Sequence, residues 1–327
     1  MFYKDFGIAL TMVDEKYREL LESQGYRFLG EHSALKICGW TKKSISNQGV
    51  CYKEKFYGIR SHLCAQISAT VNYCDFNCLL CWRKKNNSVA ETIDDPDKLL
   101  DAIPEAQRKL LSGMGGHPNI DEKLWKDSYL PKHIAISLTG ETLYYPKLNS
   151  LISKAHAKGY TTFVVTNGSQ PAILEKLEMP TQLYLSIDAP NEEIFLKVDR
   201  PLNDNVWSKV MESVEVLKKL KDKTRTALRI TLVGEYNMIE PENYAKIISL
   251  GDPHFVEVKG FMLVGDARNK LRLENMPWHD QVKEFALEIC KHCDYKLIDE
   301  HEASNVVLLM KEDFDGRVMD FTNQSCQ

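Results

Sequence analysis

The sequence predicts an α/β fold in which helices cover a mainly parallel sheet. Apolar, β-branched runs alternate with amphipathic stretches of helical spacing through most of the 327 residues. Polar or glycine residues follow several of these runs directly, which is where α/β folds place their functional loops. The alternation is typical of an open doubly wound sheet or of a complete or partial barrel.

Six apolar runs are predicted as the consecutive strands of the sheet. They lie at 66–73, 133–138, 161–166, 182–187, 227–233 and 255–263. Helices are predicted at 97–112, 147–158, 205–220, 241–250 and 278–292. A last strand at 304–310 could lie at an edge of the sheet. The segment 113–131, with three glycines and two prolines, is expected to be an ordered loop or lid.

The ends of three predicted strands carry polar or glycine residues. They are Leu138-Thr139-Gly140-Glu141, Thr166-Asn167-Gly168 and Ser186-Ile187-Asp188-Ala189-Pro190. Each one alone is consistent with ordinary turn chemistry. Three in succession favour functional loops at one end of the sheet.

The composition argues against a membrane or secreted protein. No run of 18 or more apolar residues occurs, and the amino terminus has an acidic residue where a signal peptide needs a basic flank. The nine cysteines are an odd number, and a chain of this length needs no disulfides to be stable. We therefore expect a reduced, cytoplasmic protein that uses its thiolates chemically.

The net charge of −4 conceals a basic zone in residues 36–85. This zone has nine lysines and arginines against two acidic residues, so it carries +7 and the rest of the chain −11. Such a zone can bind an anion, a phosphate or a polynucleotide locally. The alternative is a set of scattered, solvated lysines.

Cys74, Cys78 and Cys81 form a CxxxCxxC motif just after the first predicted strand. Three thiolates so close together repel one another unless a metal neutralises them. A structural zinc site uses four protein ligands, whereas an iron-sulfur cluster held by three thiolates leaves one iron open to an outside ligand. The motif favours such a cluster, and zinc or unligated thiols are the alternative.

This motif and its position resemble the radical S-adenosylmethionine enzymes. The resemblance implies a partial (β/α)6 TIM-like barrel of about six strands. It also implies that Cys74, Cys78 and Cys81 bind a 4Fe-4S cluster whose open iron chelates S-adenosylmethionine. One electron from the cluster then cleaves the cofactor to methionine and a 5′-deoxyadenosyl radical.

The same resemblance implies further contacts to S-adenosylmethionine. Gly140 and Glu141 match the motif that receives the methionyl amine. Asn167, Ser186 and Asn237 match, more loosely, the positions that meet the ribose and the carboxylate. The sequence departs from the common pattern at Leu80, where an aromatic residue is usual, and at Thr139, where a glycine is usual.

Cys38, Cys51 and Cys64 lie upstream, with twelve residues between neighbours. Three such cysteines on their own are typically buried apolar residues. Next to a radical S-adenosylmethionine motif, a second 4Fe-4S cluster held by three thiolates becomes the favoured interpretation.

Longer runs are similar to the tRNA 4-demethylwyosine synthases of the wybutosine pathway. The runs are 32–44, 51–59, 61–64, 81–83, 138–142, 199–201 and 257–262. Larger members of that family carry a preceding flavodoxin-like domain. A stand-alone member is expected to take its electrons from an external flavodoxin or ferredoxin type of donor and to act as a monomer.

Membership would imply condensation of 1-methylguanosine, beside the anticodon of tRNA-Phe, with two carbons of pyruvate. The auxiliary cluster would chelate pyruvate, and Lys53 would match a lysine that forms an imine with it. Lys55 could lower the pKa of Lys53, as a neighbouring cation does. A solvated or phosphate-contacting Lys53 is the alternative.

The basic zone then acquires a role in binding tRNA. The candidate phosphate contacts are Lys42, Lys43, Arg83, Lys84 and Lys85. An unstacked base could rest on Trp40, Tyr52 or Trp82, although aromatic residues more often belong to the core.

The predicted domains are an extension at 1–65 that carries the auxiliary cysteines, the barrel at 66–320 and a tail at 321–327. Cys290, Cys293 and Cys326 receive no role. Two other functions are considered: a different two-cluster radical maturase or activase, and a zinc-stabilised RNA-binding module without catalysis.

Overall fold

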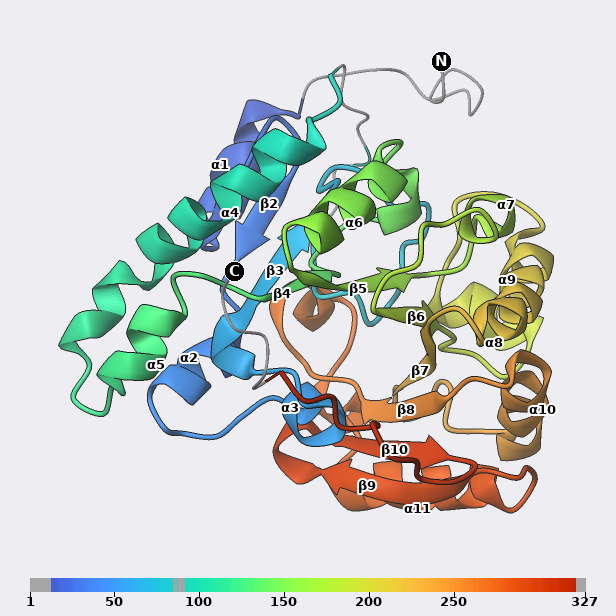
Figure 1. Ribbon diagram of the computed structural model, residues 1–327. Helices are drawn as coiled ribbons and strands as arrows, with labels where there is room; N and C mark the ends of the chain where they lie inside the picture. The colour runs from blue at the N-terminus through green and yellow to red at the C-terminus, as the bar shows by residue number, and fades with distance from the viewer. Residues whose placement is uncertain (1–12, 85–86, 88–91, 322–327) are drawn as a thin grey trace. The chain divides into compact units, whose positions relative to one another are not determined.

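The computed structural model describes residues 13–84, 87 and 92–321 (Figure 1). The chain divides into two compact units. The first comprises Met1–Cys74, Lys85–Val164 and Gly316–Gln327, and the second comprises Asp75–Lys84 and Val165–Asp315. No helix among the described residues is long and apolar enough to cross a membrane.

The first unit has an antiparallel hairpin followed by parallel strands. Its strands are β1 (Tyr26–Phe28), β2 (Ala34–Lys36), β3 (Cys64–Ser68), β4 (His133–Ile136) and β5 (Thr161–Thr166). The β1, β2 and β3 strands pair antiparallel, and β3, β4 and β5 pair parallel. The helices are α1 (Glu15–Ser23), α2 (Gly39–Ile45), α3 (Tyr52–Tyr57), α4 (Pro96–Leu111), α5 (Glu122–Asp127) and α6 (Leu148–Ala157).

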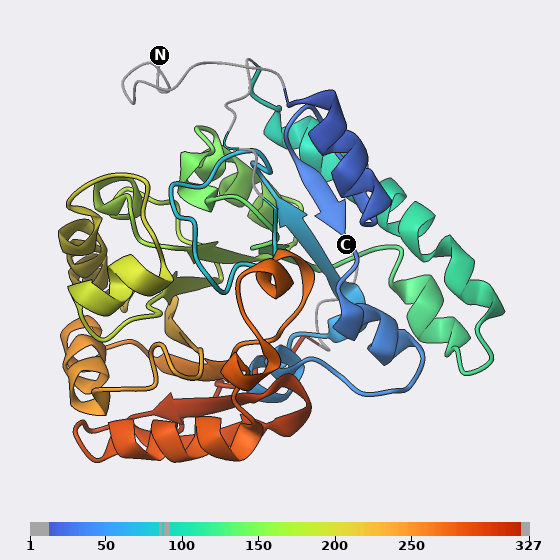
Figure 2. The same cartoon turned by 180° about the vertical axis from the view of Figure 1, so that it is seen from behind.

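Helix α4 shows why these segments are helical. Its buried residues, which include Leu99, Leu100 and Ile103, recur at helical spacing and form one apolar stripe. The Asp95 side chain caps the first turn, and Pro96 occupies the first helical position. The helix packs on β2, as Figure 1 and Figure 2 show.

The second unit continues the α/β alternation and ends in an antiparallel hairpin. Its strands are β6 (Gln182–Ser186), β7 (Arg225–Leu232), β8 (Phe255–Gly260), β9 (Lys296–His301) and β10 (Val306–Met310). The β6, β7 and β8 strands are parallel, and β10 pairs antiparallel with both β8 and β9. The helices are α7 (Pro171–Leu174), α8 (Glu192–Val198), α9 (Val206–Leu220), α10 (Pro241–Gly251) and α11 (His279–Cys290). Helix α10 packs between α9 and α11 (Figure 1).

The six predicted strands are confirmed as β3 to β8, and the five predicted helices as α4, α6, α9, α10 and α11. Several bounds differ. The strand predicted at 66–73 begins at Cys64 and ends at Ser68, and the strand predicted at 255–263 ends at Gly260. Cys64 therefore belongs to the first parallel strand and not to the segment before it.

Two expectations about secondary structure are wrong, and two short strands were not predicted. Strands β1 and β2 precede the first predicted strand, but with three residues each they are too short to show an alternating pattern. The 304–310 strand is not at an edge, because β9 covers β10 on the side away from β8. The segment 113–131 is not only a loop, since it contains α5.

Candidate active site

The CxxxCxxC loop runs from Cys74, at the end of one stretch of the first unit, into the second unit. There the segment 75–79 pairs with 198–202 through its backbone. The bonds run from Asn77 N–H to Arg200 C=O (2.9 Å), from Leu79 N–H to Val198 C=O (2.8 Å) and from Leu202 N–H to Asp75 C=O (2.8 Å). The run Asp199-Arg200-Pro201, to which the sequence assigned no role, therefore lies in the segment whose backbone pairs with the cysteine loop and fixes its conformation.

A second segment holds the other end of this loop. The Lys270 ammonium donates a hydrogen bond to the Cys78 carbonyl at 3.3 Å and forms an ion pair with Asp266 at 3.1 Å. The Asp266 N–H donates to the Trp82 carbonyl at 2.9 Å. Gly265 has a φ of +58°, and a Cβ there would lie 2.2 Å from that same carbonyl oxygen, so only glycine fits.

The donor set of this loop fits an iron-sulfur cluster. Cys74, Cys78 and Cys81 are half-buried, and none of the eight described cysteines forms a disulfide. Thiolates are the ligands that such clusters prefer. Among the described residues no three His, Cys, Asp or Glu side chains are placed to bind a single metal ion. A 4Fe-4S cluster does not require that placement, because each thiolate binds a different iron.

Gly140 and Glu141 lie against the segment that leads into Cys74. The Glu141 N–H donates to the Tyr73 carbonyl at 2.8 Å, and the Glu141 carboxylate accepts from the Leu143 N–H at 3.1 Å. Gly140 has a φ of +74°, and a Cβ there would lie 1.8 Å from the Thr70 carbonyl oxygen. Within the first unit, the turn after β4 is therefore fitted closely to the start of the cysteine loop.

Asn167 and Asn237 make hydrogen bonds that support the second unit. The Asn167 amide donates to the Asp75 carboxylate at 2.9 Å, which links the end of β5 to the cysteine loop. Asn237 is fully buried, and its amide donates to the carbonyls of Asp188 (2.7 Å) and Thr231 (2.8 Å). Both amide hydrogens of Asn237 are thus used by the backbone, and its contact with S-adenosylmethionine stays a prediction.

The end of β6 carries a titratable group that the sequence reasoning treated only as part of a turn. Ser186, the last residue of β6, is half-buried. Asp188 follows it and accepts a hydrogen bond from the Thr231 N–H at 2.7 Å. Burial raises the pKa of Asp188 to about 6, although the bonds from Thr231 oppose the shift.

The structure brings Cys38, Cys51 and Cys64 together in the first unit. Cys38 precedes α2, Cys51 precedes α3, and Cys64 is the first residue of β3. The pKa of Cys51 and that of Cys64 are each raised to about 12, chiefly by burial and next by the Cys38 thiol, while Lys53 acts in the opposite direction on both. Because charges act on one another over about 10 Å, the three thiols and the Lys53 ammonium lie in the same region of the first unit, and we call these four side chains the thiol-lysine cluster.

Ser61 joins the three elements that carry these cysteines. Its N–H and its hydroxyl both donate to the Glu54 carboxylate, at 2.8 and 2.6 Å. Its Oγ accepts from the Cys51 N–H at 2.8 Å, and its carbonyl accepts from the Thr41 hydroxyl at 3.0 Å. The sequence contained no signal for this network, because a serine, a threonine and a glutamate at these spacings form no recognisable pattern before the chain has folded.

Lys53 lies in the first turn of α3 and is half-buried. Its ammonium is 5.7 Å from the centroid of the Phe163 ring, on β5. Lys55, on the same helix, is exposed. Phe163 is buried within β5, so Lys53 is directed at the parallel strands.

The carboxyl-terminal segment closes the end of α3. The Met319 N–H donates to the Tyr57 carbonyl at 2.9 Å, and the Arg317 guanidinium donates to the Phe56 carbonyl at 3.0 Å. Gly58 has a φ of +80°, and a Cβ there would lie 2.2 Å from the Met319 carbonyl oxygen. The sequence reasoning missed this role of the residues before 321.

The candidate RNA contacts of the first unit lie on α2. Lys42 and Lys43 are exposed in its last turn, and the Lys43 ammonium lies 4.5 Å from the centroid of the half-buried Trp40 ring. Tyr52 is buried and packs edge-on against Phe56. Tyr52 is therefore a core residue and not an open stacking platform, and that suggestion is corrected.

The candidate contacts of the second unit follow Cys81. Lys84 is exposed, but Arg83 is buried, and its guanidinium stacks 3.1 Å from the centroid of the Trp82 ring. Trp82 itself is 41% exposed. Lys85 and Cys326 lie outside the described residues. Cys290 is the last residue of α11, and Cys293 lies three residues beyond it, where its thiol donates to the Ile289 carbonyl at 3.5 Å.

Comparison with known proteins covers almost the whole chain. Residues 69–248 match the radical SAM superfamily, and residues 250–311 match a family described as wyosine base formation. An S-adenosyl-L-methionine-dependent tRNA 4-demethylwyosine synthase of Pyrococcus abyssi is 42% identical over 310 residues, which are 92% of this chain and 90% of that protein. A relative of the same name from Oryza sativa is 40% identical over 92% of this chain but only 47% of its own length.

A solved structure titled "Structure of TYW1 with a lysine-pyruvate adduct bound" is similar in fold. It has 33% sequence identity and a TM-score of 0.86, and the match covers 94% of this chain and 100% of that one. This likeness and the superfamily match confirm the predicted fold class, a partial TIM-like α/β barrel. Both other functions considered from the sequence give way to one family. The chain belongs to the S-adenosylmethionine-dependent tRNA 4-demethylwyosine synthases, which are radical enzymes that modify tRNA.

Proposed function

We propose that this protein condenses 1-methylguanosine, beside the anticodon of tRNA-Phe, with two carbons of pyruvate to form 4-demethylwyosine. The observation that carries the proposal is the cluster formed by Cys38, Cys51, Cys64 and Lys53 in the first unit. The similar solved structure of TYW1 is described as having a lysine-pyruvate adduct bound. This description supports the proposal that a lysine of this protein reacts with pyruvate.

Cys74, Cys78 and Cys81 would hold the 4Fe-4S cluster that binds S-adenosylmethionine. When bound, the cluster and its cofactor supply a 5′-deoxyadenosyl radical that can remove a hydrogen atom from the methyl group of the guanosine. The protein's own contribution is to fix the loop, through the pairing of 75–79 with 198–202 and the Lys270 contact. Gly140, Glu141, Asn167, Ser186 and Asn237 are the proposed cofactor contacts.

Cys38, Cys51 and Cys64 would hold a second 4Fe-4S cluster. A cluster with an open iron supplies a Lewis acid that can orient the carboxylate and carbonyl oxygens of pyruvate. The hydrogen bonds of Ser61 fix the positions of α2 and α3 relative to the start of β3, and these are the three elements that carry the cysteines. Two clusters, pyruvate and S-adenosylmethionine are accordingly the proposed ligands.

Lys53 is the proposed nucleophile toward pyruvate. Its neutral amine would attack the ketone carbon, and loss of one water would leave an imine. The Lys53 ammonium lies near the Phe163 ring, whereas the Lys55 side chain, on the same helix, is exposed. The pyruvate carboxylate would leave as a one-carbon fragment when the new ring is formed.

The remaining parts of the proposal follow from this chemistry. The electron would come from an external flavodoxin or ferredoxin type of protein, and the enzyme would act as a monomer in a reducing compartment such as the cytoplasm. Residues 1–65 would form the extension that carries the auxiliary cluster, 66–320 the barrel and 321–327 a tail.

Labelled pyruvate provides the decisive test. Anaerobically reconstituted protein, S-adenosylmethionine, a reductant and tRNA-Phe carrying 1-methylguanosine should transfer label from C2 and C3 of pyruvate into the tRNA. Label that never enters the tRNA, while S-adenosylmethionine is still cleaved, would refute the condensation.

Borohydride trapping tests Lys53 separately. Reduction in the presence of pyruvate should fix pyruvate covalently to the peptide that contains Lys53. The Lys53→Ala variant should lose the adduct and the condensation, whereas the matched Lys55→Ala variant should keep both. An adduct that survives in Lys53→Ala would assign the imine to another residue.

A further inference from the structure

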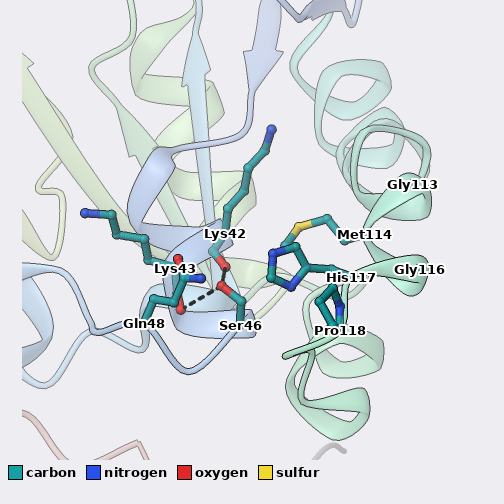
Figure 3. A pocket seen from close by; sticks show the side chains of 9 residues that line it. All are labelled: Lys42, Lys43, Ser46, Gln48, Gly113, Met114, Gly116, His117 and Pro118. Atoms are coloured by element: carbon teal, nitrogen blue, oxygen red, sulfur yellow. Dashed lines mark hydrogen bonds between the residues drawn. The ribbon is translucent and has the colours of Figure 1, made fainter.

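We propose that an open groove beside α2 binds the sugar-phosphate backbone of the tRNA. The inference rests on the proposed function and names where the substrate's polyanion is held. The groove has a volume of about 560 Å³ (Figure 3). Its lining residues are Lys42, Lys43, Ser46, Gln48, Gly113, Met114, Gly116, His117 and Pro118.

Two short segments form the walls of the groove. One wall is the last turn of α2 and the residues after it, where the Ser46 hydroxyl donates to the Lys42 carbonyl at 2.9 Å. The other is the 3-10 turn Ser112–Gly116 and the two residues that follow. In Figure 3, Met114 and His117 of the second wall face the α2 wall, the Lys42 side chain extends from α2 beside the opening, and the Lys43 side chain points away from the second wall.

The walls are fixed to one another and to the unit beneath them. The Asp121 N–H donates to the Ile45 carbonyl at 2.8 Å, which ties the start of α5 to the end of α2. The Trp125 indole donates to the Leu111 carbonyl at 2.9 Å, and its ring lies against Gly115, where a Cβ would be 2.5 Å away. The groove is therefore preformed and needs little ordering to receive a ligand.

The chemistry of the lining selects a polyanion. It presents two exposed lysines and one exposed histidine, and none of its nine residues in the described part of the chain is acidic. The whole protein carries −4, so a polyanion is attracted only where positive charge is concentrated. RNA phosphates are the polyanion that an enzyme of this family must hold.

Gly113 and Gly116 leave the backbone of the second wall open to close approach by a ligand. A Cβ added at Gly113 or at Gly116 would meet no atom within 4 Å, so the fold itself does not require glycine at either position. A ribose-phosphate backbone that lies against the wall would require it, because a methyl group there would stand between the two backbones. The groove thus combines charge with a flat, unshielded surface.

Helix α2 connects this groove to the auxiliary cysteines. Cys38 immediately precedes the helix, and Lys42 and Lys43 lie in its last turn. The seven-residue helix is about 10 Å long. A strand of RNA held by the two lysines would therefore be anchored on the same rigid element that carries one of the proposed cluster ligands.

The test measures binding of tRNA-Phe to the reconstituted protein by fluorescence anisotropy at several salt concentrations. The Lys42→Gln/Lys43→Gln variant should bind several-fold more weakly, and its slope of log K against log salt should fall by about 2, one for each lost phosphate contact. The Lys42→Arg/Lys43→Arg variant should retain binding, because its charge is unchanged. Gly116→Ala should weaken binding without lowering the thermal unfolding midpoint.

A matched control removes the same charge elsewhere. Lys209 and Lys218 are exposed on α9, and the Lys209→Gln/Lys218→Gln variant should bind tRNA as the wild type does. Unchanged affinity and slope in the Lys42/Lys43 variant, with a wild type that binds and modifies tRNA, would overturn the groove and leave the proposed function intact. A wild type that binds no tRNA would overturn both.

Discussion

The two cysteine trios differ in how the chain assembles them. Cys74, Cys78 and Cys81 lie on one loop, so their proximity follows from their spacing alone. Cys38, Cys51 and Cys64 come from the starts of α2, α3 and β3, and only packing brings them together.

The two regions are also supported by different kinds of contact. Backbone pairing with 198–202 holds much of the CxxxCxxC loop and does not depend on side-chain identity, although the Lys270 and Asn167 side chains also bond to the loop. The auxiliary trio depends on the side chains of Ser61, Glu54 and Thr41. The CxxxCxxC loop therefore keeps part of its support when nearby side chains change, whereas the auxiliary trio is sensitive to single polar side chains, each three positions from one of its cysteines.

The largest expected effect is on catalysis, because loss of a cysteine from either trio should stop a different step of the reaction. Cys78→Ala should abolish cleavage of S-adenosylmethionine, while Cys51→Ala should spare uncoupled cleavage and stop incorporation of pyruvate. Each variant should lose about four irons per chain, one cluster's worth. Measurements of iron content, 5′-deoxyadenosine and labelled tRNA check these outcomes. Equal loss of cleavage in both variants would mean that the trios do not act independently.

Two glycines allow each region to be disturbed without touching a cysteine. Gly140→Ala would place a Cβ 1.8 Å from the Thr70 carbonyl oxygen, and Gly58→Ala would place one 2.2 Å from the Met319 carbonyl oxygen. Both positions have positive φ, so we expect each change to cost about 3 kcal/mol or more of unfolding free energy. Thermal unfolding measures this cost.

Gly39→Ala is the control for that comparison. Gly39 lies next to Cys38, has no positive φ, and a Cβ there would meet nothing within 4 Å. It should unfold at the same temperature as the wild type or slightly above it, since alanine favours the helix. A loss of stability equal to that of Gly58→Ala would show that steric clash is not the cause.

A smaller effect tests side-chain support against backbone support. Ser61→Ala removes the hydroxyl that bonds Glu54 and Cys51, and should cost about 1–3 kcal/mol and lower the iron bound by the auxiliary trio. Asn77→Ala keeps the backbone bond to Arg200 and changes only an exposed side chain, so stability should move by less than about 0.5 kcal/mol. Iron content and thermal unfolding measure both variants. Equal losses in Ser61→Ala and Asn77→Ala would show that the two cysteine trios do not differ in their dependence on side chains.

The smallest expected effect is the pH response of Asp188. Its pKa is about 6 in the folded protein and about 3.9 when unfolded, so the folded state binds more protons between these values. Protonation of Asp188 therefore adds to the free energy of unfolding, and this addition is complete below about pH 4. It is lost as the pH rises through about 6, where the folded protein releases the proton. Asp188→Asn should therefore gain stability relative to the wild type between pH 4 and 7, by about a few degrees in Tm. A difference in Tm that does not vary with pH would contradict the shift.

Much of the secondary structure was accessible from local pattern. Strands β3 to β8 and helices such as α4 carry strong periodicity, because one face of each is buried. Strands β1 and β2 are too short to show it, and β9, with Asp299 and Glu300, is only half-buried and so lacks an apolar run. Their existence depends on the partner strands with which they pair.

The sequence by itself determined the chemistry: three thiols on one loop after a strand, three more at regular intervals, and a basic zone around them. Tertiary structure alone decided which groups support that chemistry. The Ser61 network, the backbone pairing of 75–79 with 198–202 and the groove between α2 and Ser112–Gly116 each join residues from separate elements of the fold. Ligand spacing within a loop is a local property, whereas a hydrogen bond between distant segments exists only after the apolar core has brought them into contact.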